Sequence, residues 1–135
     1  MITISNLTKK YNDVTVLDIS SLTIQPGESF GLVGNNGAGK TTLFRLVLDL
    51  IEANSGEVII NDQPVARRDE LKSYVGSFLD ENFLIDYLTP DEYFSFVGKL
   101  YSKSEGDIAA FVEKFSEFFN GEVAGNKKLI RELSK

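Results

Sequence analysis

The chain has 135 residues and is acidic, with 20 Asp and Glu against 14 Lys and Arg and a net charge of −6. It has no basic stripe that could neutralise several phosphates, which disfavours direct binding to nucleic acid. It also contains no cysteine and no histidine, which excludes disulfide scaffolds, thiolate metal sites and the commonest general base of enzymes.

The first part of the chain predicts β-strands. Met1–Ser5 alternates apolar and polar residues, and Val14–Ile24 is rich in strand-forming residues up to the turn dipeptide Pro26-Gly27. Ser29–Val33 is a short apolar run, which predicts a buried strand. The sequence therefore predicts three strands ahead of the glycine-rich segment that follows.

That glycine-rich segment matches the phosphate-binding pattern G-x-x-x-x-G-K-[ST]. The next segment, Thr41–Leu50, predicts a helix with Leu43, Leu46, Val47 and Leu50 on one face. Glycines let successive N–H groups turn toward a phosphate chain, and the helix N-terminus adds the positive end of its dipole. Lys40 would contact the β- and γ-phosphates, and the Thr41 hydroxyl would bind Mg²⁺. The residues predicted to bind the nucleotide here are Gly34, Asn35, Asn36, Gly37, Ala38, Gly39, Lys40, Thr41 and Thr42.

Further along, Glu57–Ile60 and Ser73–Leu79 predict two short strands. The polar segment Asp80–Tyr87 follows as a linker that could act as a hinge. We therefore expect a β-rich nucleotide-binding core with its phosphate loop and hinge over residues 1–87, and a helical subdomain over residues 88–135.

The helical part begins with a strong start signal. Thr89-Pro90-Asp91-Glu92 combines an N-cap residue, proline at the first helical position and glutamate three residues after the cap. Ser104 is the predicted N-cap of a second helix, with the acidic residue Asp107 three positions later. The apolar stripe after it predicts a packing surface, made by Ile108, Phe111, Val112, Phe115, Phe118 and Phe119.

Taken in order, these segments resemble the N-terminal part of the ATP-binding subunit of ABC transporters. The resemblance rests on Leu7-Thr8-Lys9-Lys10-Tyr11, Pro26-Gly27-Glu28, Gly31-Leu32-Val33-Gly34, the phosphate loop, Asn54-Ser55-Gly56-Glu57-Val58 and Leu88-Thr89-Pro90-Asp91-Glu92-Tyr93. It implies an α/β fold: a P-loop NTPase core with an N-terminal antiparallel β subdomain, the start of an α-helical subdomain and an incomplete central sheet.

The resemblance also implies residue roles. Tyr11 would stack on adenine with Val16 as a neighbour. Asp80 would take the metal-contacting position where the family usually has glutamine, with the adjacent Glu81 as the alternative. Ser134 lies in what looks like the opening of the signature loop, which contacts ATP bound by a partner subunit. The family's catalytic glutamate and switch histidine have no counterpart in this chain, so its catalytic residues are unknown. We therefore expect an N-terminal fragment that binds ATP without hydrolysing it alone.

For the parent protein, the resemblance implies ATP hydrolysis coupled to membrane transport, with ATP and Mg²⁺ as cofactors. It implies a second ATP-binding subunit in a dimer, an integral membrane partner and a cytoplasmic place at the inner face of the membrane. The first residues lack the layout of a signal peptide. Two alternatives stay open: a nucleotide-binding module that does not hydrolyse, and a P-loop small-molecule kinase. The kinase is less favoured because a β-rich stretch with Tyr11 precedes the phosphate-loop strand.

Overall fold

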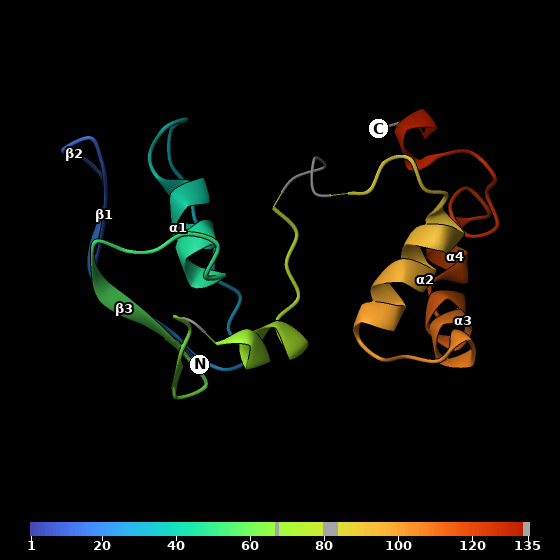
Figure 1. The fold of residues 1–135 in the computed structure, drawn as a ribbon, viewed down its shortest axis with the longest axis horizontal. Coiled ribbons are helices and arrows are strands. Elements are labelled where there is room, and N and C mark those ends of the chain that lie inside the picture. The colour runs from blue at the N-terminus through green and yellow to red at the C-terminus, as the bar shows by residue number, and fades with distance from the viewer. Residues whose placement is uncertain (67, 80–83, 134–135) are drawn as a thin grey trace. The chain divides into compact units, whose positions relative to one another are not determined.

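The computed structural model describes residues 1–66, 68–79 and 84–133 (Figure 1). Its internal contacts divide the chain into two compact units, Met1–Leu79 and Asp80–Lys135. The described part of the first unit contains β-strands and one α-helix, and that of the second unit contains helices. Across the described ranges, no helix is long and apolar enough to cross a membrane.

The first unit is built on an antiparallel sheet. Its strands are β1 (Ile2–Tyr11), β2 (Val14–Ile24), β3 (Ser55–Ile60) and β4 (Gln63–Pro64), in the spatial order β2-β1-β3-β4. β1 runs well beyond the predicted Met1–Ser5, because its pairing with β2 continues to the hairpin end. At that end Asn12 and Asp13 both have positive φ, which is the backbone geometry of a tight two-residue hairpin turn.

The core of this unit lies between the sheet and helix α1 (Lys40–Val47), which covers one face of the sheet (Figure 1). Leu43 and Leu46, three positions apart, both point inward. The buried cluster consists of Ile4, Leu7, Leu43, Leu46, Val58, Ile60, Val65 and Leu71. The prediction that Leu50 lies on the same helical face is wrong. The helix ends at Val47, Asp49 has a positive φ, and Leu50 is exposed beyond it.

Two predicted strands do not form. Ser29–Val33 runs into the phosphate loop without strand pairing, and a 3₁₀ turn, η1 (Asp69–Ser73), replaces the start of Ser73–Leu79. A strand needs a neighbour for its backbone hydrogen bonds, and the described residues place none beside these segments. The prediction that Ser29–Val33 is buried is also wrong, since 92% of Val33 is exposed. The antiparallel part of the fold is therefore formed, while the parallel central sheet is incomplete, as expected.

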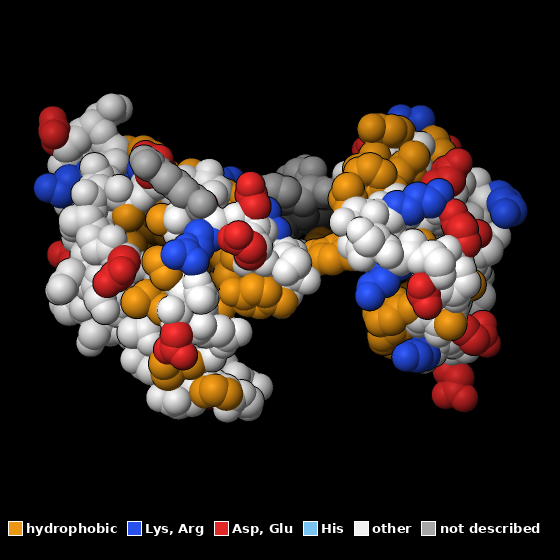
Figure 2. All heavy atoms as spheres, turned by 60° about the horizontal axis from the view of Figure 1, so that its bottom comes forward, with side chains coloured by type: hydrophobic (Ala, Val, Ile, Leu, Met, Phe, Trp, Pro, Cys, Tyr) orange, Lys and Arg blue, Asp and Glu red, His pale blue; other side chains and the backbone are white. Residues whose placement is uncertain are grey.

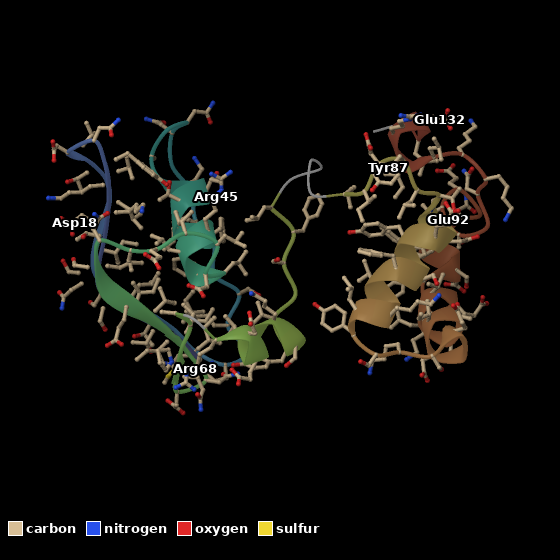
Figure 3. All side chains as sticks on the ribbon, viewed as in Figure 1. Asp18, Arg45, Arg68, Tyr87, Glu92 and Glu132 are labelled. Carbon is tan, nitrogen blue, oxygen red and sulfur yellow. The ribbon has the colours of Figure 1, made fainter. Side chains whose placement is uncertain are left out.

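The second unit contains α2 (Pro90–Leu100), α3 (Glu105–Glu113), α4 (Ser116–Phe119) and the 3₁₀ turn η3 (Ile130–Glu132). Both predicted helix starts are confirmed, because α2 and α3 each begin with a complete capping box. Figure 3 labels Glu92, the acidic member of the first box, in the first turn of α2.

The aromatic stripe of the second unit packs only in part. The Phe119 ring lies 5.9 Å from that of Phe94 and 6.0 Å from that of Phe115, measured between centroids. The helix breaks after Glu113, however, and Phe118 is 84% exposed. Breaking the helix changes the direction of the later side chains, and Phe118 meets the cluster edge-on at Phe119, with 6.0 Å between ring centroids.

Candidate functional site

The phosphate loop lies directly before α1 and is shaped by its glycines. Gly37 and Gly39 have φ of 84° and 88°, in the region that favours glycine. The Ala38 N–H donates to the Asn35 carbonyl at 3.1 Å, which closes a turn within the loop. Gly39 is the N-cap of α1, and its carbonyl accepts the first helical hydrogen bond, from Leu43 N–H at 2.9 Å. The first N–H groups of α1 therefore have no acceptor within the helix and are available to an anion.

Lys40 is folded over this loop. Its Nζ donates to the Gly34 carbonyl at 2.6 Å and to the Asn35 carbonyl at 2.8 Å. These two bonds hold the ammonium at the mouth of the glycine turn, where an oxygen of a phosphate chain could replace or add to the carbonyl acceptors. A phosphate there would form charge-assisted hydrogen bonds, which are stronger than neutral ones. The loop thus combines backbone donors, a helix N-terminus and a fixed cation.

Strand β2 approaches the loop closely at Gly39. A Cβ atom on this glycine would lie 2.5 Å from the Val16 carbonyl oxygen and 3.4 Å from Leu17 Cδ1. A cavity of about 360 Å³ lies beside this contact, and Val16, Leu32 and Lys40 are among its lining residues. The structure therefore brings the predicted residue Val16 together with the phosphate loop.

The charged groups of this cavity are few. Lys40 and Asp18 are the charged side chains among its lining residues, and Figure 3 labels Asp18 on β2. Arg45, also labelled, lies in the last turn of α1, where a positive charge complements the helix dipole. The described lining of the cavity therefore includes one cation, at the loop, and one carboxylate, on the neighbouring strand.

Tyr11 lies at the end of β1 and is 47% exposed. The β1–β2 turn and the phosphate loop are at the same end of the first unit (Figure 1). Tyr11 does not line the cavity beside the loop, whereas Thr15, Val16 and Leu17 of the paired strand do. Lys9 Nζ lies over the Tyr11 ring, 5.1 Å from its centroid. The ring is thus accessible to a planar ligand, with a cation beside it.

The predicted metal site is only partly described. Thr41 is exposed in the first turn of α1, next to Lys40, so its hydroxyl fits the role of one Mg²⁺ ligand. Asp80 and Ser134 lie outside the described residues. Within the described ranges, no three acidic side chains gather closely enough to form a metal site of their own. Of the two predicted metal ligands, the structure therefore describes Thr41, whose hydroxyl fits a metal bound together with a phosphate chain.

Several residues at this site escaped the sequence prediction, Asp18 and Ile19 among them. Thr15 and Leu17 line the cavity, and Lys9 lies over Tyr11. The signal for Lys9 was present, because residues two apart on a strand point to the same face. Leu17 had no comparable signal, since its neighbour Gly39 is far away in the chain.

Comparison with known proteins gives a consistent picture. Residues 17–135 match the family model described as ABC transporter. The ABC transporter ATP-binding protein NatA of Bacillus subtilis is 32% identical over 144 residues, covering 98% of this chain and 58% of NatA. The Nod factor export ATP-binding protein I of Cupriavidus metallidurans is 35% identical over 134 residues, covering 96% of this chain and 43% of that protein. The chain thus spans about half the length of these relatives.

Solved structures agree on the fold. A putative ABC transporter ATP-binding protein from Pyrococcus furiosus aligns with a TM-score of 0.74 and 28% identity, covering 98% of this chain and 62% of that one. The ATP-binding cassette MJ0796, solved as a dimer in a post-hydrolysis state with ADP and Pi, aligns with a TM-score of 0.81 and 22% identity. That alignment covers 99% of this chain and 63% of that one. These likenesses confirm the predicted fold class.

Proposed function

Because this chain belongs to the family of ABC transporter ATP-binding proteins, we propose that its phosphate loop binds ATP and that the whole protein uses ATP to drive membrane transport. The observation that carries the proposal is the loop itself. Two glycines with positive φ lead into the N-terminus of α1, and Lys40 is held over the loop by two carbonyl groups. This arrangement offers backbone donors and a cation to a triphosphate.

In this proposal the nucleotide extends from the phosphate loop toward the β1–β2 hairpin. Residues 34–42 bind the phosphates, with Lys40 contacting the β- and γ-phosphate oxygens. Tyr11 stacks on the base, and Val16, which contacts the loop at Gly39, borders it. Support comes from the half-exposed Tyr11 ring and from the cavity beside Val16.

Thr41 and Asp80 are the residues we propose to hold Mg²⁺, which would neutralise charge on the phosphates when bound. Ser134 is proposed to contact ATP bound by a second ATP-binding subunit. The similar cassette MJ0796 forms a dimer in its solved structure, which supports a dimeric arrangement. We propose an integral membrane subunit as the second partner, which would place the protein at the inner face of the membrane. The names of two relatives, a Nod factor export and a spermidine/putrescine import ATP-binding protein, support a role in transport.

A second candidate is nucleotide binding without hydrolysis by the 135 residues themselves. Hydrolysis needs a residue that orients the attacking water. The chain has no histidine, and among the described residues that line the cavity at the loop Asp18 is the single acid. This observation favours a binding role for these residues and leaves hydrolysis to the whole protein.

The test is Mg·ATP binding to the wild-type chain and to Lys40→Ala, measured by isothermal titration calorimetry. We expect affinity to fall at least about tenfold in Lys40→Ala, since hydrogen bonds to charged groups contribute about 1.5–3 kcal/mol. Lys128→Ala removes an exposed lysine of the second unit and should bind like the wild type. Equal affinity in the wild type and Lys40→Ala would rule out the phosphate-loop assignment.

Phosphate release measured on the same samples separates the two candidates. Binding that depends on Lys40 without phosphate release favours the binding module. Release that depends on Lys40 shows that these residues suffice for hydrolysis.

A further inference from the structure

The Lys9 ammonium joins two parts of the first unit. Its Nζ lies over the Tyr11 ring, 5.1 Å from the centroid, and donates to the Glu52 carbonyl oxygen at 2.7 Å. A surface lysine usually moves freely in water, whereas this one has a carbonyl acceptor on one side and an aromatic face on the other. The two contacts fix the cation relative to the ring.

The backbone next to Lys9 is also fixed by hydrogen bonds to the segment that contains Glu52. The register between β1 and β2 shifts between Lys9 and Lys10, which marks a bulge. The Lys10 N–H donates to Asn54 Oδ1 at 2.7 Å, and the Asn54 N–H donates to the Thr8 carbonyl at 2.9 Å. The end of β1 is therefore tied to the segment between α1 and β3, and the Glu52 carbonyl that holds Lys9 lies in that same segment.

The position of Lys9 restricts the orientation of the Tyr11 ring. The side chain is half exposed, so little packing fixes its rotamer. A cation held over one face of the ring favours the rotamers that keep the contact and leaves the opposite face to a ligand. An ordered ring loses less side-chain entropy when a planar group stacks on it.

We propose that Lys9 is a positioning residue for the nucleotide base, which it serves by orienting the Tyr11 ring. The inference rests on the proposed ATP binding and names a residue that acts on the base rather than on the phosphates. Lys9 needs no contact with the nucleotide, because it acts through the ring.

The experiment compares two ligands, Mg·ATP and inorganic tripolyphosphate, by isothermal titration calorimetry. Tripolyphosphate engages the phosphate loop but has no base. Lys9→Met keeps most of the aliphatic length and removes the charge. It should weaken ATP binding about two- to fivefold, the range that corresponds to cation–π contacts at exposed sites. Its affinity for tripolyphosphate should equal that of the wild type. The matched control is Lys10→Met at the adjacent exposed lysine, with both affinities unchanged.

Further variants and outcomes test the positioning role of Lys9. Lys9→Arg keeps a cation that can lie over the ring and should restore the ATP affinity. Equal ATP binding by Lys9→Met and the wild type overturns the positioning role alone. Loss of both ligands in Lys9→Met also overturns it, because the lysine would then act on the fold. If Lys40→Ala binds ATP as well as the wild type does, the proposed function fails, and this inference fails with it.

Discussion

At the scale of single residues, Gly39 shows two separate reasons for a glycine in one position. Its φ of 88° is costly for any other residue. Its missing side chain also makes room for the Val16 carbonyl, which a Cβ would approach to 2.5 Å. The phosphate-loop pattern predicts a glycine here, but only the contact with β2 explains why the space around it is closed.

Gly39→Ala and Gly37→Ala separate these two reasons. Gly37 also has a positive φ, but a Cβ there meets nothing within 4 Å. Gly37→Ala should therefore cost about 1–2 kcal/mol of unfolding free energy from backbone strain. Gly39→Ala should cost about 1–3 kcal/mol more, because β2 or the loop must also shift. Urea unfolding without nucleotide measures both values, and equal losses would argue against a tight β2–loop contact.

At the scale of elements, the sequence predicted the helix starts correctly because the interacting residues lie three positions apart. The α2 box is closed by the Thr89 N–H, which donates to Glu92 Oε2 at 2.8 Å, and α3 repeats it with the Ser104 N–H, which donates to Asp107 Oδ2 at 3.1 Å. The hydrogen bond from the Thr89 backbone holds the pKa of the Glu92 carboxyl below its usual range, helped by the Thr89 hydroxyl. The Ser104 hydroxyl, followed by the Ser104 backbone N–H, lowers the pKa of Asp107 in the same way.

These lowered pKa values predict acid sensitivity of the second unit. A carboxyl with a lower pKa in the folded state stabilises that state above its ordinary pKa, and the contribution is lost as pH falls through the folded value. Helicity measured by circular dichroism should therefore hold from neutral pH down to the ordinary carboxyl pKa, about 4, and decline below it as Glu92 and Asp107 are protonated. The double variant Glu92→Gln and Asp107→Asn should be less helical at pH 7 and vary less with pH. Glu113→Gln, a charge removal at the end of α3, is the control. An identical pH profile in the double variant and the wild type would contradict the capping role.

At the scale of the whole molecule, much apolar surface is uncovered. Phe78 and Phe118 are 72% and 84% exposed, and Figure 2 shows hydrophobic side chains gathered at several places on the surface. In the second unit, Pro90 is the buried residue of the described helices. Large exposed apolar patches favour association with other surfaces.

We therefore expect the 135-residue chain to bind the dye ANS and to self-associate as its concentration rises, which light scattering after size exclusion would detect. Phe118→Ser should reduce both effects because it removes an exposed ring. Phe119→Ser should instead lower stability by about 1 kcal/mol or more, since its ring packs between Phe94 and Phe115. A monodisperse monomer with a sharp cooperative melt and no dye binding would contradict this expectation.

The amino-acid sequence by itself determined the phosphate loop, the strand Val14–Ile24 and the starts of α2 and α3. Each depends on residues close together in the chain, such as the glycines around Lys40 or the pair Thr89 and Glu92. Only the tertiary structure decided that Val16 meets Gly39, that Lys9 lies over Tyr11 while bonded to Glu52, and that residues 29–33 remain unpaired. These features depend on segments far apart in sequence, because strand pairing and close backbone contacts need a partner that local patterns do not specify.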